Sequence, residues 1–117
     1  MDTIVGLDLG GASVAVGVDT IQLSSAVLGY AAFGATALIN AGGAVAMNGP
    51  TLAAALQGLY NAGGTLNCAV NNVGLFTYGA DTYLIAADSV AGLGTNDIVI
   101  KVTGVTGTLD LSDLTIV

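Results

Sequence analysis

The sequence predicts an α+β fold that is rich in β-structure, with antiparallel hairpins and one or two short helices. Two observations support this prediction. Runs of β-branched and aromatic residues, separated by Gly, Asn and Asp, recur mainly over residues 3–18 and 66–117. Helix start and stop signals appear between these two regions, at about residues 25–33 and 50–61.

The chain has 117 residues, which is enough for one domain with one core. We therefore expect a single domain over residues 1–117. Its composition divides it into an N-terminal β-hairpin region (1–24), an uncharged Ala/Gly-rich helical region (25–65) and a C-terminal β region (66–117).

The N-terminal region contains two β-rich runs, 3–9 (TIVGLDL) and 13–18 (SVAVGV), joined by Gly10-Gly11. The expected structure is a strand pair. The segment resembles the first phosphate-binding strand–turn–strand of the actin and sugar-kinase superfamily. That fold needs two lobes and further nucleotide motifs, which 117 residues cannot provide. We therefore interpret the segment as a hairpin.

The first helix signal follows Ser24-Ser25, which offers an N-cap to the apolar run AVLGYAAF. We expect one or two helical turns that end near Gly34. The second signal has Asn48 as the candidate N-cap and Pro50 in the first turn. One apolar face follows, which we expect to pack on a sheet, and it consists of Leu52, Leu56, Leu59 and Tyr60.

Five short β runs follow from residue 66, separated by Asn, Gly and Asp; they are 66–70, 74–78, 81–87, 97–103 and 108–111. The turn Gly79-Ala80-Asp81 predicts a hairpin between the second and third runs. Strand alternation places Phe76 and Tyr78 on one face of the first strand of this hairpin. It likewise places Tyr83 and Ile85 on one face of the other strand.

Charge excludes several classes of function. The chain has eight Asp, no Glu, His or Arg, and Lys101 as its only basic side chain, so the net charge is −7. One Lys cannot neutralise a nucleic-acid backbone, so we expect no nucleic-acid partner. A chain without His or Arg also lacks the usual proton shuttle and the usual anion clamp, so we predict that this protein is not an enzyme.

Sixty-one consecutive residues, 20–80, carry no charged side chain. A monomer in water normally distributes charge over its surface, so this stretch predicts contact with other protein or with lipid. Self-association is the first hypothesis, and its expected interface residues are Leu28, Tyr30, Phe33, Leu38, Leu52, Leu56, Leu59 and Tyr60. The alternative is a membrane-associated protein with residues 26–47 in the bilayer. Residues 26–47 contain four Gly and have no flanking Lys or Arg, and both features argue against a membrane span.

Oxygen-bearing side chains in the C-terminal turns are candidates for a Ca²⁺ site. Asp81 lies in a turn, Asp88 follows a β run, and Asn96-Asp97 follows a Gly-rich turn. Ca²⁺ favours such carboxylate and amide oxygens. Asp and Asn are also ordinary turn residues, so both interpretations stay open. Cys68 is the only cysteine; we expect it to be buried, with an intermolecular disulfide as the alternative.

The two ends of the chain bear on export. The N-terminal residues MDTIVGLDLG lack the basic region of a cleaved secretory signal, so we expect another route. The C-terminus is similar to the uncleaved signals of type I secreted proteins, with an acidic residue before a hydrophobic run: Asp113, Leu114, Thr115, Ile116 and Val117. A closing edge strand would have the same pattern, and both interpretations can hold together.

Residues 74–117 carry a broader likeness. The runs GLFTYGADTYLIAAD and GTNDIVIKVTGVTGTLDLSDLTIV resemble the C-terminal modules of RTX-type (hemolysin-type) and S-layer-like bacterial surface proteins. The run DTIQLS at residues 19–24 is similar to the segment that leads such modules out of calcium β-rolls. No β-roll repeat is present here. The resemblance implies an extracellular, type I exported protein with a structural or surface-layer role.

Overall fold

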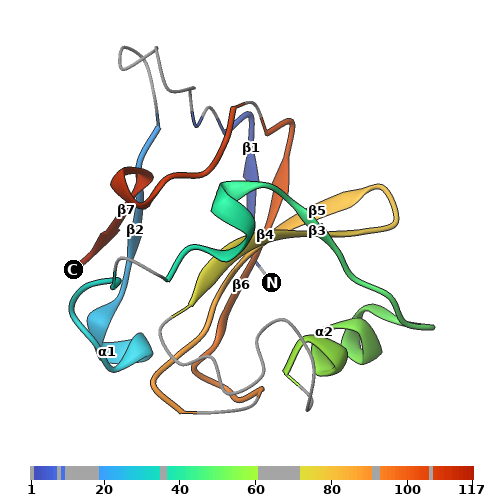
Figure 1. The fold of residues 1–117 in the computed structure, drawn as a ribbon, viewed down its shortest axis with the longest axis horizontal. Helices are drawn as coiled ribbons and strands as arrows, with labels where there is room; N and C mark the ends of the chain where they lie inside the picture. The colour runs from blue at the N-terminus through green and yellow to red at the C-terminus, as the bar shows by residue number, and fades with distance from the viewer. Residues whose placement is uncertain are drawn as a thin grey trace.

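A computed structural model describes residues 2–7, 9, 19–34, 37–60, 72–90, 93–105 and 107–117. Its centre is a five-stranded mixed sheet (Figure 1), and a separate two-stranded sheet lies against it. The five strands, in spatial order, are β1 (Asp2–Val5), β6 (Ile98–Thr103), β5 (Asp81–Ala86), β4 (Val73–Tyr78) and β3 (Val45–Ala46). The small sheet consists of β2 (Ile21–Leu23) and β7 (Leu114–Ile116).

The middle of the large sheet matches the sequence prediction. β4 and β5 form the expected antiparallel hairpin, and the register pairs Tyr78 with Asp81 across the turn Gly79-Ala80. Gly79 has a φ of +61°, which a residue without Cβ adopts at little cost. β5 then pairs antiparallel with β6. The predicted α+β class, rich in β-structure with short helices, is confirmed.

The outer pairings differ from the expected antiparallel hairpins. β1 pairs with β6, β3 with β4, and β2 with β7, and all three pairs are parallel. Parallel pairs need long connections, so no local turn signal announces them. The predicted partner run for β1 at 13–18, the predicted strand at 66–70 and Cys68 all lie outside the described residues.

The predicted strand at 108–111 is wrong. Residues 108–110 have no regular structure, and a 3₁₀-helix begins at Leu111 (Leu111–Asp113). Asp110 and Asp113 form a reciprocal capping box there, in which each carboxylate accepts from a backbone N–H of the other end. These short-range hydrogen bonds occupy backbone N–H groups that a strand would use for pairing. The segment therefore forms a 3₁₀-helix and not a strand.

Both predicted helices exist, with different ends. Helix α1 (Ser25–Leu28) begins as predicted at Ser24, whose Oγ accepts from Val27 N–H at 3.4 Å. It ends at Gly29, in the left-handed conformation with a φ of +83°, and not near Gly34. Helix α2 (Leu52–Tyr60) is capped by Thr51, whose Oγ1 accepts from Ala54 N–H at 3.2 Å. The prediction of Asn48 as N-cap, with Pro50 in the first turn, is therefore wrong.

The large sheet is covered on both faces: in Figure 1 the β2–β7 sheet lies to its left and α2 to its lower right. The first core packs the β2–β7 sheet and α1 against one face of the large sheet; its central residues include Leu28, Leu75 and Leu84. The second core packs α2 on the opposite face, against Phe76, Tyr83 and Ile85. Because β5 contributes alternate residues to both cores, residues 83–86 are all buried. The predicted pairs Phe76 with Tyr78 and Tyr83 with Ile85 do share this second face.

Candidate functional site

The predicted calcium ligands divide between the two ends of β5. Asp81 begins this strand, whereas Asp88 follows its other end. A strand rises about 3.3 Å per residue, so the two carboxylates lie on the order of 20 Å apart. Asp81 is instead paired with Lys101, at an Nζ–Oδ1 distance of 3.3 Å. The four predicted residues therefore cannot form one site, and Asp81 does not belong with the others.

Asp88 and Asp97 do come together, across the loop that joins β5 to β6. Asp97 Oδ1 accepts a hydrogen bond from Asp88 N–H at 2.9 Å, and its Oδ2 accepts from Gly94 N–H at 2.6 Å. Asp88 Oδ1 accepts from Val90 N–H at 2.8 Å. Asn96 is exposed next to Asp97. The loop is thus folded around its own carboxylates, which is the ordinary role of Asp in turns.

The two carboxylates differ in burial, because Asp97 is half-buried and Asp88 is buried. Asp88 is only 5% exposed. Burial raises the pKa of Asp97, and its two backbone hydrogen bonds oppose this by favouring the charged form. The neighbouring Asp88 carboxylate also raises the pKa of Asp97, both by its charge and by a side-chain hydrogen bond. Two acidic groups therefore share one partly buried space.

Two tyrosines complete this group, which we call the Asp88–Asp97 cluster (Asp88, Asp97, Tyr30 and Tyr60). Tyr30 comes from the segment after α1, and its hydroxyl donates to Ala87 O at 2.5 Å. Burial, then the charges of Asp88 and Asp97, raise the pKa of Tyr30 to about 12. Tyr60 comes from the end of α2 and is buried. Burial, and then Asp97 and Asp88, also raise the pKa of its hydroxyl.

The hydroxyl of Tyr60 lacks a hydrogen-bond partner among the residues that the structure describes. It lies close enough to Asp97 that both the charge of this carboxylate and a side-chain hydrogen bond to it help to raise the pKa of Tyr60, although the two groups do not meet strict hydrogen-bond geometry. The sequence interpretation placed both tyrosines at an interface and missed their place beside the acidic pair. Tyr60 and Asp97 are far apart in sequence, so no spacing pattern could have found them.

Within the described ranges, no group of three or more His, Cys, Asp or Glu side chains converges in a way that could hold a metal ion. The chemistry of the Asp88–Asp97 cluster is limited to two carboxylates and two phenols. These are oxygen ligands for a hard cation, or acceptors for a proton.

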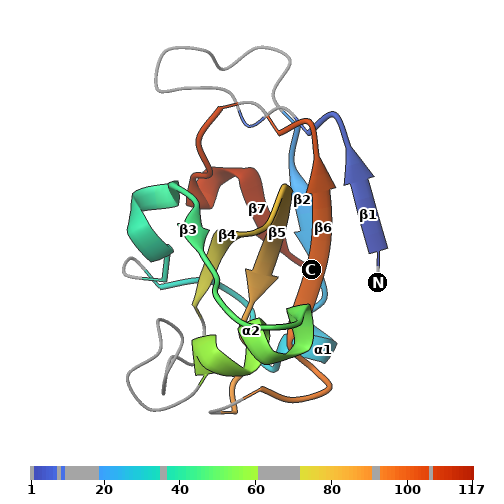
Figure 2. The same ribbon diagram turned by 90° about the vertical axis from the view of Figure 1, so that its right-hand side faces the viewer.

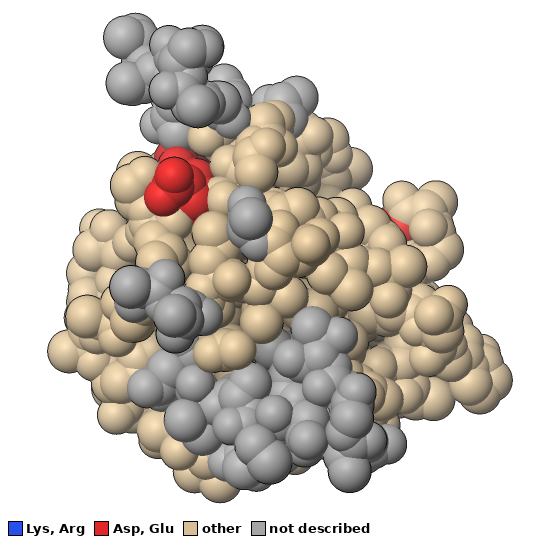
Figure 3. Space-filling model, in the orientation of Figure 1, with Lys and Arg blue, Asp and Glu red and all other residues tan. Residues whose placement is uncertain are grey.

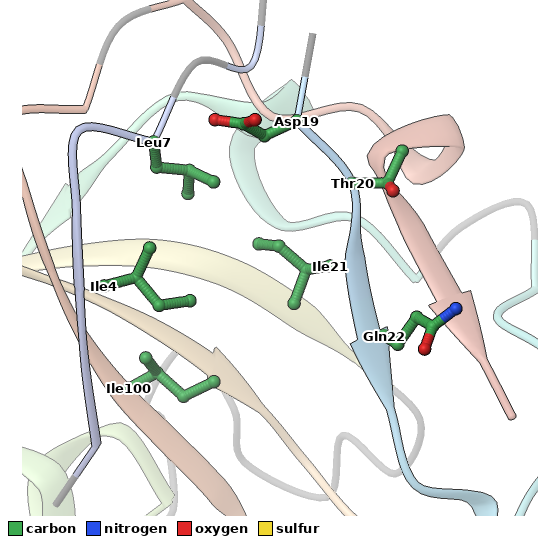
Figure 4. A pocket seen from close by; sticks show the side chains of 7 residues that line it. All are labelled: Ile4, Leu7, Asp19, Thr20, Ile21, Gln22 and Ile100. Atoms are coloured by element: carbon green, nitrogen blue, oxygen red, sulfur yellow. The ribbon is translucent and has the colours of Figure 1, made fainter.

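A hollow of about 540 Å³ lies between the two sheets and opens to the surface. Figure 4 shows Ile4 and Ile100 from the large sheet facing Ile21 of β2 across this space, with Asp19 at its upper end. Of the described residues that line it, Asp19 is the only titratable one. Its described lining is mixed, since four aliphatic side chains lie beside Asp19, Thr20 and Gln22.

The predicted interface residues pack largely within the chain itself. Leu28, Leu59 and Tyr60 are buried in the two cores, at 0%, 5% and 7% exposure. A side chain buried within its own chain has no area left for a partner, so the predicted interface cannot include these three. The remaining five are half-buried and pack against the cores: Tyr30, Phe33, Leu38, Leu52 and Leu56.

The C-terminal residues that resemble a secretion signal are part of the fold. The buried carboxylate Oδ2 of Asp113 accepts from Asp110 N–H at 2.8 Å in the capping box. Leu114 and Ile116 of β7 pack into the first core, while Thr115 and Val117 are exposed. The alternative expectation of a closing strand is confirmed, with β2 as its parallel partner.

Residues 26–47 are not one continuous helix. Their described parts contain most of α1, a 3₁₀-helix (Ile39–Gly42) and the strand β3. Among the helices in the described part of the chain, none combines the length and the hydropathy that crossing a bilayer requires.

Comparison of this chain with family models, with curated proteins and with solved structures finds no match. The likeness of residues 74–117 to RTX-type and S-layer-like modules therefore stays a prediction from the sequence.

Proposed function

We propose that this protein is a non-catalytic structural subunit that assembles with copies of itself into a filament or surface layer outside the bacterial cell. The observation that carries the proposal is the position of β1 as the outermost strand of the large sheet within the described ranges of the chain. Figure 2 displays β1 as the outermost strand, with β6 on its inner side. A strand edge presents unpaired N–H and C=O groups, to which another chain can add a strand.

The register indicates which groups of β1 face outward. Gly6 N–H donates to Thr103 O at 2.7 Å, so Gly6 directs its N–H toward β6. Because backbone groups alternate along a strand, Ile4 also faces β6, whereas Thr3 and Val5 direct their N–H and C=O groups outward. Val5 is 77% exposed. Natural edge strands are commonly protected by short length, charged side chains, Pro or a bulge; β1 has neither Lys nor Pro, and its four residues include one charged residue, Asp2.

The distribution of charge also favours association. Asp81 is paired with Lys101, Asp88 and Asp113 are buried, and Asp97 is tied to backbone N–H groups. These four carboxylates are therefore partnered or buried within the fold, while the net charge of −7 still opposes association. The face drawn in Figure 3 is accordingly mostly uncharged, and acidic atoms of its described residues appear only in its upper part.

The test is electron microscopy of negatively stained, detergent-free protein over a range of concentrations. The wild type should form regular polymers. Val5→Lys places a charge at this edge and should abolish them, because a strand cannot pair against a desolvated ammonium group. Val90→Lys is the matched control, since Val90 is similarly exposed at 67% but lies in a loop.

Each outcome bears on a different part of the proposal. Wild-type protein that stays monomeric at every concentration would overturn the assembly function. Polymers that persist equally in both variants would exclude β1 as the contact. Recovery only from detergent-extracted membranes would support the alternative, a small membrane-associated protein with residues 26–47 in the bilayer.

The extracellular location rests on the resemblance of residues 74–117 to exported modules and on the hydrophobic C-terminal run. Fractionation of producing cells tests it separately. Recovery in the medium or on the cell surface supports export, and exclusive recovery in the cytoplasm contradicts it.

A further inference from the structure

A groove runs along one edge of the small sheet. It consists of two adjoining hollows, of about 540 and 420 Å³, whose linings share Gln22 and Ile100. Strand β2 contributes one wall, and β1 and β6 contribute the other. In Figure 4, the first hollow lies on one side of β2 and its partner strand β7 on the other. We call this space the β2 groove, with Thr20, Gln22 and Ser24 on one wall and Ile4, Ile98 and Ile100 on the other.

The register of β2 directs backbone groups into the groove. Val117 N–H donates to Leu23 O at 2.8 Å, so the backbone groups of Leu23 face β7. Because these groups alternate along a strand, Gln22 directs its N–H and C=O away from β7, toward the groove. Among the described strands, β2 pairs with β7 alone. Gln22 is exposed, so the backbone of an incoming peptide can reach these two groups.

The opposite wall carries a row of incompletely covered isoleucines. Ile4, Ile98 and Ile100 lie at the border of the first core, on the face of the large sheet that the small sheet covers. All three are half-buried, whereas Leu84 on the neighbouring strand β5 is fully buried. Packed sheets lie about 10 Å apart, with the side chains of their inner faces filling the space. A third strand on the outer edge of β2 would therefore cover this row.

Acidic side chains lie at both ends of the groove. Asp19 lines the first hollow, beside Thr20, and Asp97 lines the second. The only basic side chain of the sequence, Lys101, lies within the large sheet and pairs with Asp81. A second copy of this chain therefore brings little positive charge to the groove. Charge complementarity favours a basic segment of a different protein.

We propose that the β2 groove binds an extended, basic segment of another protein, which adds to the outer edge of β2 as a third strand. The backbone of this segment pairs with Gln22, and its alternate apolar side chains cover Ile98 and Ile100. Its basic side chains meet the acidic ends of the groove. Strand addition obtains affinity from the backbone and specificity from alternate side chains. From Thr20 to Ser24 the edge spans roughly 13 Å, which an extended segment of about five residues matches.

This surface is separate from the contact proposed for self-assembly, which uses the backbone edge of β1. The two proposals therefore stand or fall independently. Size-exclusion chromatography of the protein with and without peptide distinguishes them, because peptide binding to β2 does not require a change in oligomeric state.

The probes are labelled hexapeptides that alternate Val, Ile or Leu with Thr and carry Lys at both ends. Their fluorescence anisotropy should rise saturably with wild-type protein. The same peptides with Glu in place of Lys should bind severalfold more weakly, and salt should reduce this difference. Absence of saturable binding by every Lys-ended peptide would overturn the proposal.

Methylation of the peptide backbone tests strand addition on the unmutated protein. Only every second N–H of an added strand faces β2. Methylating one alternate set of peptide nitrogens should therefore abolish binding, and methylating the other set should leave it nearly unchanged. Equal tolerance of both sets would overturn the proposal, because the peptide would then not pair as a strand.

Matched variants locate the peptide on β2. Gln22→Pro removes an N–H that does not pair with β7, so the fold should persist, as proline is tolerated at such edge positions. Peptide affinity should fall about tenfold, the loss expected when a backbone acceptor is left unpaired. Gln22→Ala keeps the N–H and should bind as the wild type does. Equal affinity of the two variants would place the peptide elsewhere.

A second pair of variants tests the charge complementarity. Asp19→Asn should weaken the binding of Lys-ended peptides severalfold, whereas Asp81→Asn, which changes the net charge equally but lies outside the groove, should not. Equal loss in both variants would mean that only the overall charge attracts the peptide, and would overturn the assignment to this groove.

A competition experiment tests the alternative occupant, a second copy of this chain. An unlabelled peptide copied from β1 (Asp2–Val5) should compete poorly, because it is acidic. Competition as strong as that of the Lys-ended peptides would overturn the assignment to a basic partner.

Discussion

The carboxylate of Asp97 accepts a hydrogen bond from the backbone N–H of Asp88, at 2.9 Å, and so closes the loop between β5 and β6. Its second oxygen accepts from Gly94 N–H at 2.6 Å. One side chain therefore satisfies two backbone donors in a segment that has no strand partner of its own. The contact also places Asp97 beside the buried Asp88 and the Tyr60 hydroxyl.

Asp97→Ala should lower the free energy of unfolding by about 1–3 kcal/mol, because the mutation leaves the partly buried N–H of Asp88 without its acceptor. Urea unfolding in chelator, with circular dichroism as the readout, measures this loss. Asn96→Ala is the control, since Asn96 is exposed in the same loop. Equal stability of the two variants would contradict the proposed role of the Asp97 carboxylate.

Alkaline pH should destabilise the protein through Tyr30. Burial, followed by the charges of Asp88 and Asp97, raises the pKa of Tyr30 from its usual 10.0 to about 12 in the folded state. The stabilising contribution of the neutral phenol is therefore fully present below pH 10.0 and is lost as the pH rises through about 12. Tyrosinate absorbance and the unfolding free energy, followed together over this range, test the prediction.

Tyr30→Phe removes the titrating group, so this variant should lose less stability over that pH interval than the wild type. Tyr78→Phe serves as the comparison, because Tyr78 lies at the opposite end of the β4–β5 hairpin. An unchanged alkaline profile in Tyr30→Phe would show that another group is responsible.

Gly42→Ala should destabilise the fold by about 1–3 kcal/mol, because it combines backbone strain with a steric overlap. Gly42 has a φ of +87°, and a Cβ there would overlap the carbonyl oxygen of Leu109. Gly58→Ala is the matched control: Gly58 lies within α2 with open space around it, and alanine should stabilise this helix by about 0.5–1 kcal/mol. Thermal unfolding of both variants should show Tm shifts of opposite sign, and shifts of the same sign would contradict the prediction.

The ion pair between Lys101 and Asp81 should contribute less than about 1 kcal/mol. The two side chains are 37% and 46% exposed, so water and salt screen their attraction. A double-mutant cycle with Lys101→Met and Asp81→Asn measures the coupling free energy. A value well above this range, or one that is insensitive to salt, would mean that the pair is desolvated in solution.

Much of the local structure could be predicted, and the errors have local causes. The start of α1 at Ser24 followed from a side chain that caps its own helix. The start of α2 was misplaced because Asn48 and Thr51 are both good caps, and only the path of the chain selects Thr51. The strand predicted at 108–111 failed because Asp110 and Asp113 cap each other.

Less of the candidate site could be predicted. Asp88 and Asp97 were identified by residue type, whereas Asp81 was included wrongly because sequence proximity does not reveal which end of a strand a residue occupies. Tyr60 was recognised only as part of an apolar helix face. Its hydroxyl lies near Asp97 because α2 packs on the sheet.

The sequence by itself determined the β4–β5 hairpin, the two short helices and the scarcity of basic charge, because turns, caps and composition depend on residues close together in the chain. Only the tertiary structure decided that β1 pairs in parallel with β6, that β7 pairs with β2, and that Tyr60 faces Asp97. The physical reason is that such contacts join distant segments. Their selection depends on the summed burial of two cores and not on any local preference.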